Sequence, residues 1–106
     1  MNPEDYEGAF KLISVAGNAK SSSMMAIREA REGNLEEAKK LLEEADKDLR
    51  EAHGSQTKML TQEARGNAVP VNIILVHAQD HLTGAMIIRD LAEEFIEIYS
   101  KLNADA

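Results

Sequence analysis

Apolar residues recur along the first third of the chain at steps of three, four or seven, which is the period of an α-helix. The stripe comprises Tyr6, Phe10, Ile13, Gly17, Met24 and Ile27. Asn2 can cap such a helix, Pro3 suits its first position, and acidic Glu4 and Asp5 suit its first turn. The pattern predicts a helix over about residues 3–32.

The stretch EGN at residues 32–34 predicts the end of this helix and the start of another. Gly33 can take the left-handed conformation, and Asn34 can cap the next helix and form a capping box with Glu37. A second helical stripe follows over about residues 35–64. Its members are Leu35, Ala38, Leu42, Ala45, Leu49, Ala52, Gln56 and Met59. So short a turn makes the two helices antiparallel.

Gly66, Asn67 and Pro70 mark a connection to a third helix, expected over about residues 71–102. Three helices of roughly 30 residues would each be about 45 Å long. The sequence therefore predicts a single all-α domain, residues 1–106, folded as an antiparallel up-down-up bundle of three helices.

The third helix carries two apolar stripes instead of one. The first, which we call the seam, contains Ile73, His77, Asp80, Gly84, Ile87, Leu91 and Ile98. The second stripe contains Val71, Leu75, Ala78, Leu82, Ala85, Ala92, Ile96 and Tyr99. One stripe suffices for a three-helix core, so the other predicts a homo-oligomer with this helix at its centre. Isoleucine at several seam positions favours an oligomer in which more than two copies of this helix pack together.

Composition narrows the class of protein. The net charge of −7 argues against nucleic acid as a partner, since binding phosphates needs a basic patch, and it suits a basic protein partner instead. The chain has no cysteine, which excludes disulfides and thiolate chemistry. The start MNPEDYEGAF lacks the pattern of a signal peptide, and no apolar stretch approaches the roughly 20 residues of a membrane span. We therefore expect a cytoplasmic protein that does not insert into the membrane.

The segment VHAQDHL places His77, Asp80 and His81 on one side of the third helix, because they are spaced by three and four residues. If the seam faces symmetry mates, Asp80 carboxylates converge, and a hard divalent cation relieves their repulsion. A neighbouring histidine can then be held in one tautomer, with its other nitrogen free as an acceptor or nucleophile.

Other interpretations of these histidines remain open. A histidine on an apolar seam is often a satisfied core residue, and a buried polar residue can simply fix helix register. His77 and His81 have a zinc-binding spacing, but position 78 is Ala instead of the glutamate of a metalloprotease, and His53 is the only further imidazole. His53 is by default structural or exposed. Three methionines are expected to fill the core: Met24, Met25 and Met59.

Several segments together resemble the enzyme IIA components of the lactose, cellobiose and chitobiose class of the bacterial sugar phosphotransferase system. VHAQDHL is similar to the active-site segment of that family, and AGNAKS to a segment of its first helix. AREGNLEEAKKLLEEA is similar to its first turn and second helix, and EAHGSQTKML to the end of that helix. These matches occur in the same order and cover most of residues 13–102.

The resemblance implies a three-helix bundle that forms a homotrimer through its third helices. It implies that His77 accepts a phosphoryl group from the carrier HPr and passes it to a cysteine of the cognate enzyme IIB, during uptake of a β-linked disaccharide. Asp80 corresponds to the family's cation-binding aspartate at the trimer axis, where Mg²⁺ is the expected ion. Gln79 and His81 are expected to orient or neutralise the phosphohistidine.

Three alternatives rank lower. A histidine phosphotransfer domain of a signalling relay is also a helical bundle, but its usual lysine–glycine pair after the histidine is missing. A purely structural trimerisation module and a metal-storage bundle need neither AGNAKS nor EAHGSQT. The segment TGAMIIRDL departs from the family, and Gly84 within it could loosen the oligomer interface or let helices approach more closely. His77 is expected about seven residues inside its helix, too deep for much help from the helix dipole.

Overall fold

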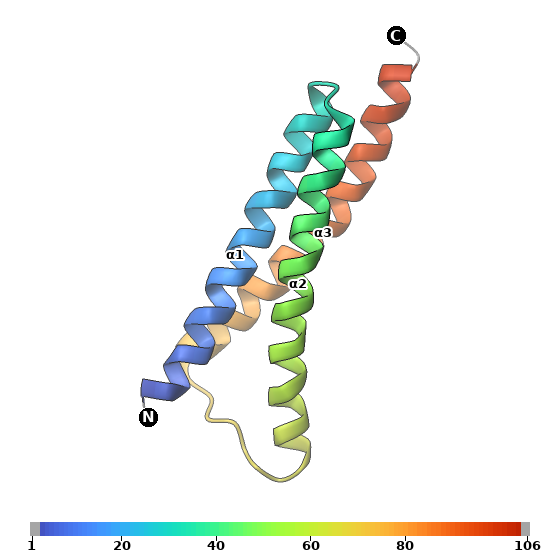
Figure 1. Cartoon of the computed structure of the whole chain (residues 1–106). Helices are drawn as coiled ribbons and strands as arrows, with labels where there is room; N and C mark the ends of the chain where they lie inside the picture. Colours follow the sequence, from blue (N-terminus) through green and yellow to red (C-terminus); the bar gives the residue numbers. More distant parts are fainter. Residues whose placement is uncertain (1–2, 105–106) are drawn as a thin grey trace.

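A computed structural model describes residues 3–104, with side chains described from residue 6, and within this range the chain forms three helices and no strand. They are α1 (Pro3–Arg31), α2 (Leu35–Ala64) and α3 (Ile73–Ala104). The helices run up, down and up in an elongated bundle of 57 × 23 × 18 Å (Figure 1). The predicted all-α fold is confirmed. The expected cap at Asn2 lies outside the described residues.

The first turn ends α1 with the predicted glycine and α2 begins at Leu35 as predicted, but the predicted side-chain cap is absent. Gly33 has a φ of 87°, and the amides of Gly33 and Asn34 donate to the carbonyls of Ala30 (3.0 Å) and Glu29 (2.8 Å). This is a Schellman motif, which satisfies the last carbonyls of α1. The predicted capping box is wrong: Asn34 makes no side-chain cap, and its Nδ2 donates instead to Glu29 Oε2 at 2.8 Å. The motif that ends α1 turns Asn34 towards that helix.

The second connection also contains a glycine in the left-handed conformation, and the helix after it begins later than predicted. Gly66 has a φ of 88°, and the amide of Asn67 donates to the carbonyl of Gln62 at 3.0 Å. The helix α3 begins at Ile73, two residues later than predicted, because Asn72 caps it. The Asn72 side-chain oxygen accepts the amide of Leu75 at 3.0 Å.

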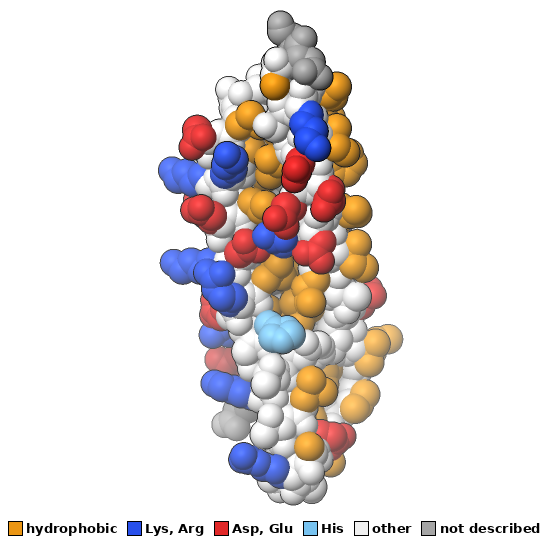
Figure 2. Space-filling model, turned by 90° about the vertical axis from the view of Figure 1, so that its right-hand side faces the viewer, with side chains coloured by type: hydrophobic (Ala, Val, Ile, Leu, Met, Phe, Trp, Pro, Cys, Tyr) orange, Lys and Arg blue, Asp and Glu red, His pale blue; other side chains and the backbone are white. Residues whose placement is uncertain are grey.

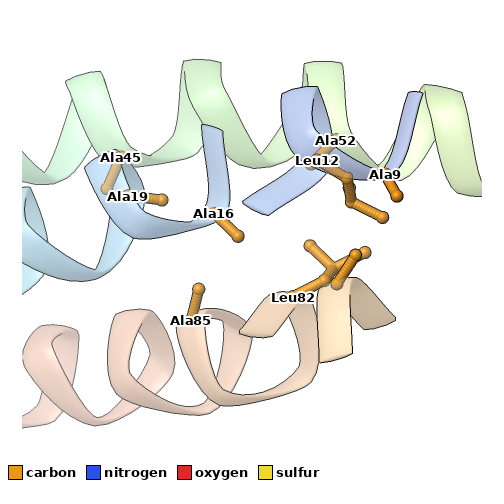
Figure 3. Packing of buried hydrophobic residues seen from close by; sticks show 9 residues of the cluster. Ala9, Leu12, Ala16, Ala19, Ala45, Ala52, Leu82 and Ala85 are labelled. Carbon is orange, nitrogen blue, oxygen red and sulfur yellow. The ribbon is translucent and has the colours of Figure 1, made fainter. Parts of the chain in front are cut away.

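Small residues form the centre of the bundle. The buried face of α1 consists of Ala9, Leu12, Ala16, Ala19, Ser23, Ala26 and Ala30. In Figure 3, Leu12 and Ala16 point towards Leu82 and Ala85 of α3. The stripe expected from the larger residues of α1 is therefore rotated from the true core: Phe10 is 56% exposed, and the other five members are only partly buried. Alanines let the helices approach closely, and the larger side chains then flank the contact.

Like the large side chains of the predicted α1 stripe, the methionines that were expected in the core lie outside its centre. Met25 is 48% exposed, so its assignment to the core is wrong. Met24 and Met59 are partly buried at the edge of the core. Ser23 is the one buried polar side chain among the described residues. Its hydroxyl donates to the carbonyl of Ala19 at 2.8 Å, so its hydrogen-bonding need is satisfied.

The stripe predicted for α2 and the second stripe predicted for α3 face the core. In α2, Ala38, Leu42, Ala45 and Ala52 are buried together with Leu41, and the other members of the stripe are partly buried. In α3 the core face is the second stripe, whose buried members are Ala78, Leu82, Ala85, Ala92 and Ile96. Val71, which precedes α3, is 75% exposed and does not belong to it. Figure 1 shows the lower end of α2 diverging from α1 and α3, so α2 and α3 share a smaller interface than either shares with α1.

Candidate functional site

The seam of α3 faces away from the bundle core. Its large side chains are exposed: Ile73 by 83%, Ile87 by 55%, Leu91 by 50% and Ile98 by 52%. The next side chains round the helix, Val76, Phe95 and Leu102, are exposed as well. Hydrophobic side chains accordingly follow the right-hand edge of the face in Figure 2, opposite an edge rich in lysine and arginine. A row of exposed large apolar side chains of this kind is typical of an interaction site.

His77 and His81 form a pair within this surface. They stand one helical turn apart on α3, and their Nε2 atoms are 3.0 Å apart. The rings meet edge to face, with centroids 4.4 Å apart and an interplanar angle of 76°. His77 is exposed and His81 is partly buried. The sequence spacing predicted this pairing, and the structure confirms that the rings touch.

The pair can share only one proton across the contact. When one Nε2 carries hydrogen and donates, the other must present its lone pair as the acceptor. Protonating both would place two N–H donors head to head at hydrogen-bond distance. The contact therefore keeps one of the two Nε2 atoms unprotonated, and release of this hydrogen bond frees its lone pair to act as a nucleophile.

The helix around His77 supplies little electrostatic help by itself. His77 is the fifth residue of α3, because the helix starts at Ile73 instead of Val71. It is closer to the amino terminus than predicted but still beyond the first turn, where the helix dipole acts most strongly. Charge neutralisation at the ring must therefore come from side chains.

Asp80 lies beside the pair and is exposed. With His81, Thr83, Gly84 and Lys20 it lines a shallow depression of about 290 Å³ between α1 and α3, which three further α3 residues complete. Among the described residues, no three histidine, aspartate or glutamate side chains of one chain gather as a metal site. A carboxylate suits a hard cation, but Asp80 is a single ligand, and the other ligands would be waters or carboxylates from other copies.

Gln79 lies on a different side of α3 from the histidine pair. Its Oε1 accepts a hydrogen bond from Gln56 Nε2 of α2 at 2.6 Å, and its Nε2 lies 3.9 Å from Met59 Sδ. Residues two apart on a helix point in different directions, so this placement follows from helical geometry. Gln79 thus connects the helical turn that carries His77 to α2, and its hydrogen bonds are to α2 instead of to the His77 ring.

His53 does not join the pair. It is exposed on α2 and lines a groove of about 590 Å³ between α2 and α3, together with Arg50, Met86 and Arg89 among others. The default assignment of His53 as a structural or exposed residue is thus confirmed as exposed.

No sequence pattern predicted the ion cluster beside this groove. Arg89 Nε and Nη2 of α3 donate to the two carboxylate oxygens of Asp46 of α2, at 2.5 and 3.1 Å, and Arg89 Nη1 donates to Glu93 at 2.6 Å. The hydrogen bond to Asp46 is the main reason that the pKa of Arg89 is raised above its ordinary value, against the opposing effect of burial. Periodicity within one helix cannot reveal a pair that joins two helices.

Within residues 3–104, none of the helices is both long and apolar enough to cross a bilayer.

Comparison with known proteins identifies the setting of this histidine pair. Residues 7–100 match the family described as the lactose/cellobiose-specific IIA subunit of the PTS system. The lichenan-specific phosphotransferase enzyme IIA component of Bacillus subtilis (strain 168) is 43% identical over 102 residues, which cover 96% of this chain and 93% of the relative.

Solved structures agree with the sequence match. The PTS cellobiose-specific enzyme IIA from Bacillus anthracis superposes with a TM-score of 0.95 at 39% identity, covering 100% of this chain and 97% of that one. The IIA(chitobiose) structure, determined in complex with HPr from the N,N'-diacetylchitobiose branch of the Escherichia coli phosphotransferase system, gives a TM-score of 0.82 at 35% identity, covering 96% of this chain and 99% of that one. The chain folds as a three-helix bundle with a histidine pair on its third helix, and it matches these proteins along nearly its whole length. It therefore belongs to the lactose/cellobiose-specific IIA family of the sugar phosphotransferase system.

Proposed function

We propose that His77 carries a phosphoryl group from HPr to a cysteine of the cognate enzyme IIB. The observation that carries this proposal is an exposed imidazole whose Nε2 lies 3.0 Å from the Nε2 of a second imidazole. The complex of a IIA relative with HPr supports the choice of donor. Family membership favours this function over a histidine phosphotransfer domain in a signalling relay.

The transfer needs no co-reactant. The lone pair of a His77 ring nitrogen attacks the phosphorus of phospho-HPr, a new N–P bond forms, and the old N–P bond breaks with its electron pair returning to the HPr imidazole. In the second transfer a thiolate of enzyme IIB attacks the same phosphorus, an S–P bond forms, and His77 recovers its lone pair. Catalysis then depends on positioning and on charge neutralisation by the protein.

His81 is suited to both tasks. In the resting chain its Nε2 can donate to His77 Nε2, and this hydrogen bond breaks when the His77 lone pair forms the N–P bond. Once a phosphoryl group occupies the His77 nitrogen, the same N–H can donate to a phosphoryl oxygen. Gln79 positions His77 indirectly, because its contacts with Gln56 and Met59 hold this turn of α3 against α2.

The apolar seam supports a homotrimer built around α3. Ile87, Leu91 and Ile98 are each about half exposed in the single chain, and burying them against two symmetry mates would be favourable. Asp80 lies on the same seam, so three carboxylates would converge on the axis. Mg²⁺ is the proposed ion there, since it prefers oxygen ligands and keeps several waters.

The proposed place of action is the cytoplasm, in a relay that energises uptake of a β-linked disaccharide through a separate membrane component. The net charge of −7 suits docking of basic protein surfaces and opposes binding of nucleic acid.

The test is phosphoryl transfer with two matched histidine variants. Wild type, His77→Gln and His53→Gln are incubated with enzyme I, HPr and labelled phosphoenolpyruvate, and the acid-labile label on each chain is measured. Wild type and His53→Gln should take up label and pass it to enzyme IIB, and His77→Gln should take up none. Since His53 is also an exposed imidazole, equal loss of label in both variants would contradict the assignment to His77.

A further inference from the structure

The AGNAKS segment has no part in the function proposed so far, yet it lies beside the histidine pair. It forms the middle of α1, which runs parallel to α3 (Figure 1). Its Lys20 lines the same depression as His81 and Asp80. Since His81 touches His77, the Lys20 side chain comes from a second helix to the edge of the reactive pair.

Lys20 is one of several cations that lack an acidic partner among the described residues, and it is the one that lines this depression. Lys11 pairs with Glu51, Lys101 with Glu97, and Arg89 with three carboxylates. Lys20 is exposed and forms no ion pair within 4.0 Å with any residue whose side chain is described, although Asp80 lines the same depression. Its charge is therefore not committed elsewhere, in a chain whose net charge is strongly negative.

The depression also has space for an added group. Gly84 contributes no side chain, and a Cβ built there would meet nothing within 4 Å outside its own helix backbone. In the single chain the depression is about 290 Å³ in volume, and Asp80 and Ile87 on its rim lie on the seam proposed as the trimer interface. A lysine stem is long and flexible, so its ammonium can move across such a space towards a new anion.

We propose that Lys20 binds the phosphoryl group carried by His77 and stabilises it on this chain. This inference rests on the proposed function. A phosphoryl group brings about two negative charges to a site where Asp80 already contributes one, and the side chain of the single chain that supplies a counter-charge to this depression is Lys20. The ammonium acts as a point charge, which a second cationic side chain can replace. Lys20 thus joins α1 to a site that otherwise lies wholly on α3.

The test compares Lys20→Gln with Lys20→Arg and with Lys47→Gln. Lys47 is also an exposed lysine, forms no ion pair with the described residues, and lies on α2, so its substitution controls for the change in net charge. The equilibrium and rate of phosphoryl exchange with phospho-HPr are measured at low and at high salt. Lys20→Gln should shift the equilibrium towards phospho-HPr by roughly threefold to tenfold at low salt and by less at high salt, because salt screens exposed charges.

Lys20→Arg should restore most of the transfer, and Lys47→Gln should behave as wild type. The inference is overturned if Lys20→Gln matches Lys47→Gln, or if Lys20→Arg is as impaired as Lys20→Gln, which would indicate a role in packing. In either case a phosphorylated wild type would leave the function of His77 intact. If wild type itself accepted no phosphoryl group, both proposals would fall together.

Discussion

Replacing Leu91 with glutamine tests whether the seam of α3 is a subunit interface. Leu91 lies on the seam and is 50% exposed in the single chain. Full burial of a leucine side chain is worth about 1.5–3 kcal/mol, so the half still exposed could add roughly 0.8–1.5 kcal/mol in the assembly. Three copies would bring about 2.4–4.5 kcal/mol per trimer, which corresponds to a roughly fiftyfold to two-thousandfold change in the trimerisation constant.

Sedimentation velocity over a range of concentrations measures this change. Wild type should sediment as a trimer, and Leu91→Gln should dissociate at much higher concentrations than wild type. The matched control is Leu60→Gln, which alters an exposed leucine (64%) on α2, outside the seam, and should leave the mass unchanged. Equal sedimentation of Leu91→Gln and wild type, or a monomeric wild type, would refute the reasoning.

Three further predictions follow from individual contacts. Asp80→Leu should keep or raise trimer stability while removing bound cation, because it replaces converging carboxylates; equilibrium sedimentation and metal analysis measure both effects, and a dissociated chain would count against it. Arg89→Met should lower the free energy of unfolding, measured by urea titration, by about 1 kcal/mol, because it removes a bidentate salt bridge between α2 and α3. Lys101→Met removes an exposed ion pair and should lower it by less than about 0.5 kcal/mol; equal losses would contradict this. Ala16→Leu should destabilise the chain by about 1–3 kcal/mol in the same assay, because Ala16 is fully buried between helices; an unchanged midpoint would show that the core can expand.

The number, order and direction of the helices could be predicted because two local signals agreed. Apolar residues kept a helical period, and among the described residues a positive φ occurs at two glycines, Gly33 and Gly66. Helix caps were less predictable than the helices themselves, because a side chain near a turn can bond to either helix. The Asn34 side chain bonds to Glu29 of α1 instead of capping α2, and Asn72, which was not expected as a cap, caps α3.

The core of α1 escaped prediction for a different reason. Periodicity was followed through the largest apolar residues, but close helix packing favours the smallest, so Ala16 and Ala19 face inwards while Phe10 faces out. In α3 the buried and exposed stripes were both foreseen, because only one of them could be used within a single chain.

The site was predictable only as far as it lies on one helix. The spacing of His77 and His81 fixed their contact in advance, and the same helical geometry places Gln79 against α2. Contributions from other helices, such as Lys20 of α1 and the pairing of Asp46 with Arg89, depend on how the helices are rotated against one another. That rotation was set by the small core residues of α1, which the larger-residue pattern obscured.

The most direct measurement is the position of the phosphoryl group on the chain. Wild type is phosphorylated by phospho-HPr, digested under alkaline conditions that preserve phosphohistidine, and sequenced by mass spectrometry. The account predicts one phosphoryl group per chain, located on His77. A phosphoryl group found on His53 or His81, with His77 unmodified, would contradict it.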